Sequence, residues 1–291
     1  YYDFKNLKNA SSSKNRIFNV PYKLTTQNDK LNEIFKFKFD SNKLVLKIQN
    51  ETNYSKNIDG DFKVTFKNRN NLFNYKIREN SLNFYLKDSN KTYDGLIEFK
   101  PFFLESNLNY QVLKIGDFVN PLLIQIFKSQ ILNNENLDAK INFNVKNIYD
   151  FDRFSDLSLK LRIEQGKMTF SNSQVNWKDN INLSFEDAIL DFENEKINLN
   201  GKIVANIEDK NDFYRSFQIN KDFRKDLKKI EFDFNYDFNE KKVYFDNLRL
   251  DNKTNENLDK FISKFNSSDE KFFNTITFKS FVKKIFDAYF G

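Results

Sequence analysis

Residues 230–238 read IEFDFNYDF, so a large apolar side chain stands at every second position and an acidic or amide side chain stands between. A period of two is the period of a β-strand with one apolar and one polar face. The same alternation recurs at residues 35–39, 62–66, 141–145 and 157–163. Short polar turns between such runs predict an antiparallel meander. Because no helix-rich second layer is evident, we expect a mainly β fold: a long meander curled into an open β-groove, with a few short amphipathic helices.

The composition of the 291 residues limits the classes of protein that the chain can belong to. Its 35 Phe residues, beside 13 Tyr and one Trp, make Phe the main core builder. The net charge is +6, but the 47 Lys and Arg residues are interleaved with 41 Asp and Glu residues along the whole chain. A nucleic-acid-binding protein gathers its basic residues on one face or stripe. We therefore expect a mixed-charge, solvated surface and no nucleic-acid partner.

The chain contains no Cys and no His, which excludes disulfides, thiolate or imidazole metal sites, and catalytic triads that depend on His. Pairs of carboxylates such as Asp191 and Glu193 fall on the polar side of predicted strands, where solvation explains them. The sequence also lacks a Gly-rich phosphate loop and a G-x-S-x-G motif. We expect no catalytic residues, no metal, no cofactor and no enzymatic activity.

The pattern divides the chain into four predicted parts. Residues 1–115 form an N-terminal β-meander, residues 116–134 an amphipathic helix, residues 135–251 a second set of β-repeats, and residues 252–291 two amphipathic helices. In detail, we expect one strand over residues 16–23, a strand over residues 197–207 that is broken at Asn200-Gly201, and a short helix over residues 209–217. Pro101 within the apolar run 95–104 predicts an edge position or a bulge, because proline cannot donate to the ladder.

Two expectations concern the arrangement of these parts. The strands between Ile141 and Leu250 are expected to pair in sequence order in one continuous antiparallel sheet, because their turns are short. The last segment has helical spacing and three nearby lysines, so we expect it to dock on the protein rather than on a bilayer. Its apolar residues are Phe278, Phe281, Val282, Ile285, Phe286 and Tyr289.

Three phrases in the second half of the chain share a "turn, glycine, alternating strand" pattern. They are LSLKLRIEQGKMTFSNSQVNWKD at residues 157–179, AILDFENEKINLNGKIVANIED at 188–209, and FYRSFQINKDFRKDLKKIEFDFNYDFNEKKVYFDNLRLD at 213–251. The region from residue 136 onward resembles the C-terminal repeats of the AsmA-like family of Gram-negative envelope proteins, in their alphaproteobacterial type. The resemblance covers about half of the chain at the level of these sequence phrases. The first hundred residues resemble the family only in the general style of their sequence.

The resemblance implies a long apolar β-groove in the periplasm, held at the inner membrane by an N-terminal helix, that acts in lipid transport and outer-membrane homeostasis. Because the chain begins with Tyr1 rather than Met, we expect the anchor to lie outside the sequence. Phospholipid is the expected ligand, and envelope proteins are possible partners. The residues expected to contact acyl chains are Phe143, Leu159, Leu161, Phe170, Leu199, Phe232, Phe234 and Phe245.

Two alternatives for the apolar face remain open at the level of sequence. The alternating residues line a groove for acyl chains, or they form the dry core of a β-sandwich. The second alternative makes the protein a structural or adhesive envelope module that binds proteins rather than lipids.

Overall fold

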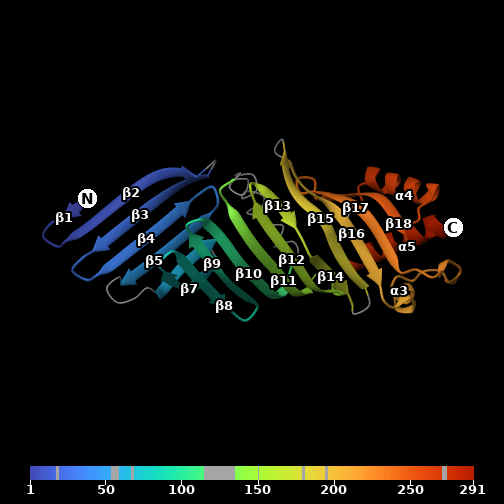
Figure 1. The fold of residues 1–291 in the computed structure, drawn as a ribbon, viewed down its shortest axis with the longest axis horizontal. Coiled ribbons are helices and arrows are strands. Elements are labelled where there is room, and N and C mark those ends of the chain that lie inside the picture. The colour runs from blue at the N-terminus through green and yellow to red at the C-terminus, as the bar shows by residue number, and fades with distance from the viewer. Residues whose placement is uncertain are drawn as a thin grey trace. The chain divides into compact units, whose positions relative to one another are not determined.

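The computed structural model describes residues 1–17, 20–53, 59–66, 69–114, 135–149, 151–178, 181–193, 196–270 and 274–291 (Figure 1). These residues contain 18 strands of one long antiparallel sheet and three α-helices, which confirms the predicted mainly β class. The chain divides into two compact units, of which the first contains residues 1–109 and the second residues 167–291, with segments 110–166 shared between them. The predicted helix over residues 116–134 lies outside the described residues.

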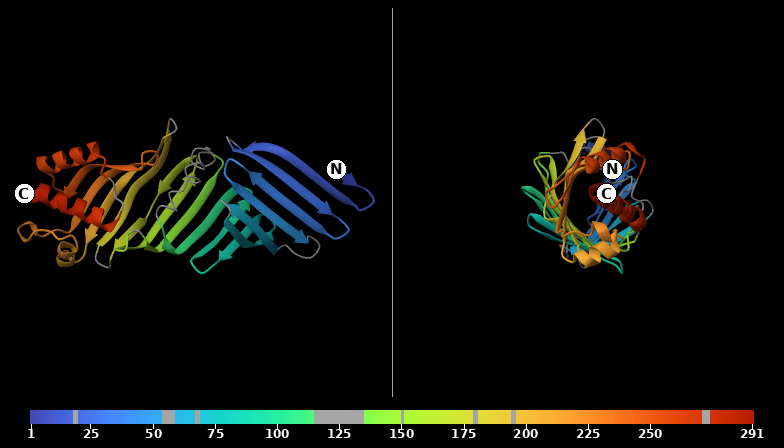
Figure 2. Two further views of the ribbon diagram at one scale, coloured as in Figure 1. Left: turned by 180° about the vertical axis from the view of Figure 1, so that it is seen from behind. Right: turned by 90° about the vertical axis from the view of Figure 1, so that its right-hand side faces the viewer.

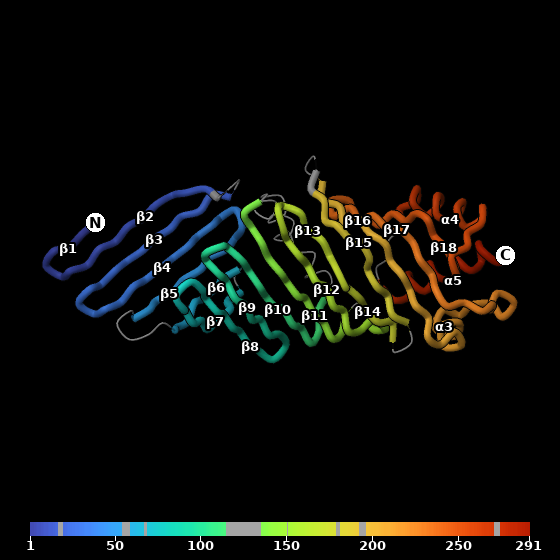
Figure 3. The backbone as a smooth tube through the Cα atoms, in the orientation of Figure 1, coloured from blue at the N-terminus to red at the C-terminus, as the bar shows by residue number. Residues whose placement is uncertain are grey.

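Strands of the first unit follow one another as hairpins, and the backbone path in Figure 3 runs back and forth between them. Asp29 and Asp88 stabilise two of the turns by accepting hydrogen bonds from backbone N–H groups of Asn32 and Lys91, respectively. The strands are β1 (Tyr2–Asp3), β2 (Lys8–Ile17), β3 (Val20–Asp29), β4 (Ile34–Ser41), β5 (Leu46–Asn53), β6 (Asp59–Phe66), β7 (Arg69–Arg78), β8 (Ser81–Lys87), β9 (Lys91–Phe99) and most of β10 (Phe102–Leu113).

One face of the first unit is apolar but only half-buried. Leu24, Phe39, Ile48 and Val64 are successive cross-strand partners, so their side chains form one row across β3 to β6. All four are of intermediate exposure. Among the described residues of this unit, the buried apolar side chains are few: Val20, Leu44, Tyr75, Leu86 and Ala139.

The second unit continues the meander in sequence order and carries the helices. β13 and β14 are two parts of one interrupted strand, because both pair with β15 and β14 also pairs with β12. Its strands are β11 (Asp138–Ile148, in part), β12 (Phe154–Glu164), β13 (Lys167–Phe170), β14 (Ser173–Trp177), β15 (Ile181–Glu193), β16 (Lys196–Ile207), β17 (Lys229–Asp237) and β18 (Lys242–Leu250). The expected continuous antiparallel sheet between Ile141 and Leu250 is confirmed.

Three bulges bend the strands of the second unit. Asp156, Asp187 and Asn247 have φ values of 50°, 49° and 50°, and the pairing register shifts beside each of them. Asp and Asn enter this left-handed region more readily than most residues. A bulge inserts one unpaired residue and increases the local twist. The apolar face is kept across the insertion: Phe185 before Asp187 and Ala188 after it lie on the same side.

The helices α3 (Lys210–Ser216), α4 (Glu256–Ser267) and α5 (Thr275–Phe290) and the 3₁₀ turn η2 (Lys221–Phe223) pack at the C-terminal end of the second unit. Figures 1 and 2 show α4 and α5 next to each other beside β18. Asn274 begins α5 with a capping box, in which its side chain accepts from the backbone N–H of Thr277. The predicted docking of this helix on the protein is confirmed, since Phe281, Val282, Ile285 and Phe286 are buried.

Several details predicted from sequence are wrong. The expected strand over residues 16–23 is split, because β2 ends at Ile17 and β3 begins at Val20. Pro101 lies in the turn between β9 and β10, rather than at an edge or bulge within one strand. β16 does not break at Gly201, because this residue pairs with Phe234. A Cβ atom at Gly201 would lie 2.8 Å from the Cα atom of Ala188, so the glycine permits a close approach between strands.

Candidate functional site

A partly open apolar cavity of about 480 Å³ lies in the second unit. Its size falls in the range of about 300–1,000 Å³ that is typical of small-molecule sites. Strands β11, β12 and β14 to β18 supply one wall, and the helices α3 and α5 supply another. The wall residues include Leu183, Phe185, Ile203 and Phe232 on the strands and Phe213, Phe217, Phe281, Val282 and Ile285 on the helices.

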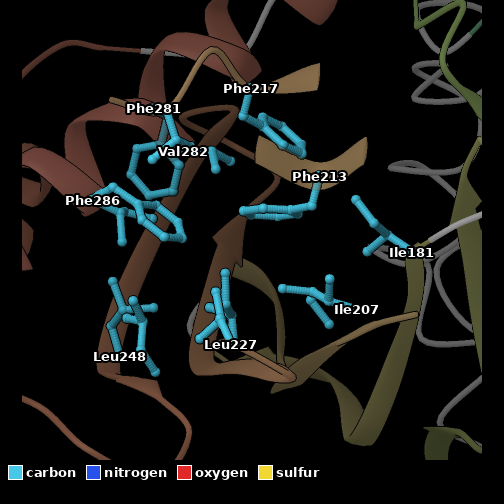
Figure 4. Packing of buried hydrophobic residues seen from close by; sticks show 14 of the residues in the cluster. Ile181, Ile207, Phe213, Phe217, Leu227, Leu248, Phe281, Val282 and Phe286 are labelled. Carbon is cyan, nitrogen blue, oxygen red and sulfur yellow. The ribbon is translucent and has the colours of Figure 1, made fainter. Parts of the chain in front are cut away.

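Aromatic rings hold the helices against the sheet around this cavity. The ring of Phe245 lies 5.0 Å from that of Phe281 and 5.0 Å from that of Phe232. Figure 4 shows Phe281, Val282 and Phe286 of α5 facing Phe213 and Phe217 of α3, and the Phe213 and Phe286 rings are 5.6 Å apart. Edge-on and tilted ring pairs of this kind add to the stabilisation from burial.

The two ends of the cavity carry its polar groups. Trp177 lies at one end, where it pairs across the sheet with Ile181. Tyr236 and Lys241 lie at the other end, near the turn between β17 and β18. Burial raises the pKa of Tyr236, and the neighbouring negative charge of Asp237 raises it further, so its hydroxyl is protonated at neutral pH. Within the described part of the chain, Lys241 is the one charged residue that lines this cavity.

The structure brings four of the eight sequence-predicted contact residues to this cavity: Leu199, Phe232, Phe234 and Phe245. Leu199 and Phe232 are half-buried, whereas Phe234 and Phe245 are 7 % and 6 % exposed and belong to the hydrophobic core. The alternation predicts the same environment for Phe232 and Phe234. The structure differs, because Phe234 is packed in the core while Phe232 is half-buried.

The other four predicted residues lie elsewhere. Phe143 is buried and its ring lies 5.4 Å from that of Tyr110. Leu159, Leu161 and Phe170 are half-buried on β12 and β13 and do not line the cavity.

Sequence reasoning missed Trp177 and the residues of α3 that complete the wall. The polar triplet Ser171-Asn172-Ser173 reads as a turn, so the short strand β14 that begins at Ser173 is easily missed in the sequence. Val175 and Trp177 nevertheless alternate with polar neighbours, as a strand requires. The contribution of Phe213 and Phe217 follows from the tertiary position of α3, which no local pattern specifies.

A second, polar groove of about 960 Å³ runs between β18 and α4. Its walls include Asp233, Asp246, Arg249 and Asp259. Charged walls of this kind are unsuited to hydrocarbon chains, so the apolar cavity is the better candidate for a ligand site.

The first unit adds an aromatic row on its half-buried face. The rings of Phe62 and Phe73 stack at 5.0 Å with an interplanar angle of 2°, and Tyr93 stacks on Phe73 at 6.2 Å. The adjacent residue Leu72 points to the opposite face and is 59 % exposed. This row is therefore apolar surface without a covering layer among the residues that the structure describes.

The described residues contain no group of three or more acidic side chains placed to hold a metal ion. Over the same residues, none of the helices has the length and apolar character needed to span a membrane. Comparison of the chain with protein-family models, characterised proteins and solved structures finds no match.

Proposed function

We propose that the protein is a non-enzymatic lipid-binding and lipid-transport protein of the AsmA-like type. In this proposal it acts in the periplasm, attached to the inner membrane, where it holds phospholipid acyl chains against the apolar face of its sheet and supports outer-membrane homeostasis. The observation that carries the proposal is the 480 Å³ cavity, whose walls are almost wholly aromatic and aliphatic. Such walls suit hydrocarbon, and the hydroxyl of Tyr236 and the amine of Lys241 lie at one end of them.

The dimensions of the cavity suit one acyl chain. Its wall includes Ile230 and Tyr236 of β17, and six residue steps along a strand span about 20 Å at ~3.3 Å per residue. One leaflet of a bilayer offers about 15 Å of hydrocarbon, half of the ~30 Å core. Burying roughly ten methylenes at ~0.8 kcal/mol each gives about 8 kcal/mol of gross stabilisation, from which the costs of association are subtracted.

The alternative is a structural or adhesive envelope module with a dry β-sandwich core. That architecture needs two sheets packed face to face, whereas the described strands belong to one sheet. The half-buried aromatic row of the first unit also lacks a second sheet to pack against among the described residues. These features favour the lipid-binding proposal.

Native mass spectrometry and lipid extraction of the purified protein test the proposal. We expect phospholipid to co-purify with the native chain. Leu183→Asn places an amide in the cavity wall at a half-buried position, so it should reduce bound lipid several-fold while the protein stays folded. Ser184→Asn is the matched control, because the adjacent side chain points to the opposite face of β15, and it should leave bound lipid unchanged.

Two results would refute lipid binding at this cavity. One is a native protein that carries no phospholipid after purification from a Gram-negative host and takes none from vesicles. The other is equal lipid content in the Leu183→Asn and Ser184→Asn variants. Phe234→Asp is a poorer probe than Leu183→Asn, because Phe234 is core-packed and its replacement is expected to unfold the unit.

A further inference from the structure

Trp177 is the one tryptophan of the chain, and it lines the apolar cavity from the end of β14. Its side chain is 1 % exposed. Three aromatic rings surround it, with centroids 4.9 Å away for Phe154, 4.8 Å for Phe217 and 5.3 Å for Phe278. Among the described residues, its buried indole nitrogen Nε1 has no hydrogen-bond partner.

An unpartnered indole N–H is unusual in an otherwise apolar wall. The group has given up its hydrogen bonds to water and has gained none within the described protein, and native structures retain few such groups. Contact of an N–H with a ring face is weaker than a hydrogen bond to oxygen. Phenylalanine, the commonest residue of this wall, would fill it without that cost. The orphan donor suits an acceptor that arrives with the ligand, and because Nε1 is sealed from solvent in this structure, that acceptor reaches it only when a packed ring such as that of Phe278 turns aside.

We propose that the ligand of this cavity carries an uncharged carbonyl oxygen, as a fatty acyl ester does, which accepts a hydrogen bond from Nε1 of Trp177. The hydrocarbon chain of the ester then lies along the apolar wall between the sheet and α5. This inference rests on the proposed lipid-binding function and adds the chemical identity of the polar group that the cavity recognises.

A neutral ester fits this position better than a carboxylate. A buried charge needs a charged or strongly hydrogen-bonding partner. The adjacent cation, Lys178, is already engaged: its Nζ donates to Oγ of Ser216 at 3.0 Å and lies 3.7 Å from Oδ2 of Asp212. The rings of Phe154, Phe217 and Phe278 beside the indole offer a carboxylate no compensation.

The indole N–H signal in a proton–nitrogen correlation NMR spectrum tests this proposal on the unmodified protein. A single tryptophan gives a single indole cross-peak, so no assignment is needed. We titrate ¹⁵N-labelled protein with a fatty acid methyl ester, with an alkane of the same chain length, and with the free fatty acid. We expect the ester to move the indole proton downfield, as a new hydrogen bond requires, and the alkane to leave it close to its starting position.

A Trp177→Phe variant provides the second measurement, because it removes the donor and keeps an aromatic ring. Loss of one net hydrogen bond should weaken ester binding about 2- to 10-fold, while alkane binding stays unchanged. Displacement of a fluorescent acyl probe gives both affinities.

The outcomes separate this inference from the proposed function. If ester and alkane bind but move the indole proton equally, or lose affinity equally in Trp177→Phe, the ester inference is wrong and lipid binding stands. If the free fatty acid moves the proton further and binds more tightly than the ester, the carbonyl belongs to a fatty acid and the ester assignment is overturned. If no ligand binds, the proposed function itself fails. Should Trp177→Phe not fold, the titration of the native protein decides.

Discussion

At the scale of single residues, Asp29 shows how side chains fix the hairpins of the first unit. Its carboxylate accepts from the backbone N–H of Asn32 at 3.2 Å and from the side-chain amide of Asn32 at 2.8 Å. Nζ of Lys8 lies 2.8 Å from Oδ2, the oxygen that also accepts from the side-chain amide of Asn32. The hydrogen bond from Lys8, followed by those from Asn32, lowers the pKa of Asp29 from 3.8 to about 2.

This lowered pKa predicts a defined pH dependence. Because the pKa of the folded state lies below that of the unfolded state, the stabilisation by Asp29 is complete above about pH 4 and is lost as the pH falls through about 2. A carboxyl-carbon NMR titration should place its midpoint near 2, and Lys8→Gln should move the midpoint toward 3.8. An unchanged midpoint in Lys8→Gln would show that the ion pair does not form in solution.

Gly201 gives a second prediction for one residue. A β-branched side chain there would meet Ala188 of the neighbouring strand, whose Cα lies 2.8 Å from the position of an added Cβ. We expect Gly201→Val to lower the free energy of unfolding by about 1–3 kcal/mol, as overpacking does. Urea denaturation measures the change, and equal stability of the variant would indicate that β15 and β16 are further apart.

The candidate site is partly predictable at this scale. Leu199 and Phe232 follow from alternation, because a strand that presents apolar residues to one side must line whatever lies there. Alternation cannot distinguish Phe232, which is half-buried, from Phe234, which is packed in the core. That difference depends on which ring α3 and α5 cover, and such contacts connect residues far apart in the chain.

At the scale of elements, the bulges are visible in the sequence as slips in the alternation. In β15 the apolar positions run Leu183 and Phe185, then Ala188 and Leu190, so the phase changes by one residue at Asp187. A one-residue slip would otherwise turn the remaining apolar residues to the opposite face. The period of two predicts the strands, while the acidic or amide residue at the slip marks the bulge, which the simple alternation does not specify.

We expect Asp187 to tolerate only residues that adopt positive φ. Asp187→Gly should preserve stability within about 1 kcal/mol, whereas Asp187→Val should cost about 1–2 kcal/mol more than the glycine variant, because a β-branched residue is strained at φ 49°. Thermal unfolding of the two variants measures the difference. Equal stability would mean that the bulge can move along the strand.

The edge of β18 carries another prediction for an element. The side chain of Asn266 in α4 accepts from the backbone N–H of Phe245 at 3.0 Å and donates to its carbonyl at 2.7 Å, which is how a neighbouring strand would pair. Exposed edges promote association. We expect Asn266→Ala to destabilise the unit by about 1–3 kcal/mol and to cause concentration-dependent self-association in analytical ultracentrifugation. Ser263→Ala on the same helix is the control and should remain unassociated.

At the scale of the whole molecule, the two units bury their apolar residues differently. The second unit has a large buried cluster beneath its helices, beside the apolar cavity. The described part of the first unit leaves its aromatic row half-buried. Sequence predicted the mainly β class and the C-terminal helices, because both depend on local periodicity. The sequence could not predict which unit buries its apolar face, because the burial of a face depends on what packs against it.

The half-buried row predicts a contrast between adjacent residues of β7. Phe73→Gln should reduce the amount of bound phospholipid while lowering the free energy of unfolding by less than the ~3–5 kcal/mol that a fully buried Phe would cost on truncation. Leu72→Gln changes the exposed face and should affect neither quantity. Quantitative lipid extraction beside urea denaturation gives both values. Identical lipid content in the two variants would remove the first unit from the lipid-binding surface.

The central claim is that an acyl chain occupies the cavity beside Trp177, and quenching of its fluorescence tests this claim most directly. The native protein is titrated with phospholipid whose acyl chains carry bromine, which quenches tryptophan on contact, and with the same phospholipid without bromine. Because Trp177 is the only tryptophan, all emission reports on this cavity. We predict that the brominated lipid strongly reduces the emission and that the plain lipid does not. Unchanged emission with brominated lipid demonstrably bound to the protein would contradict the account.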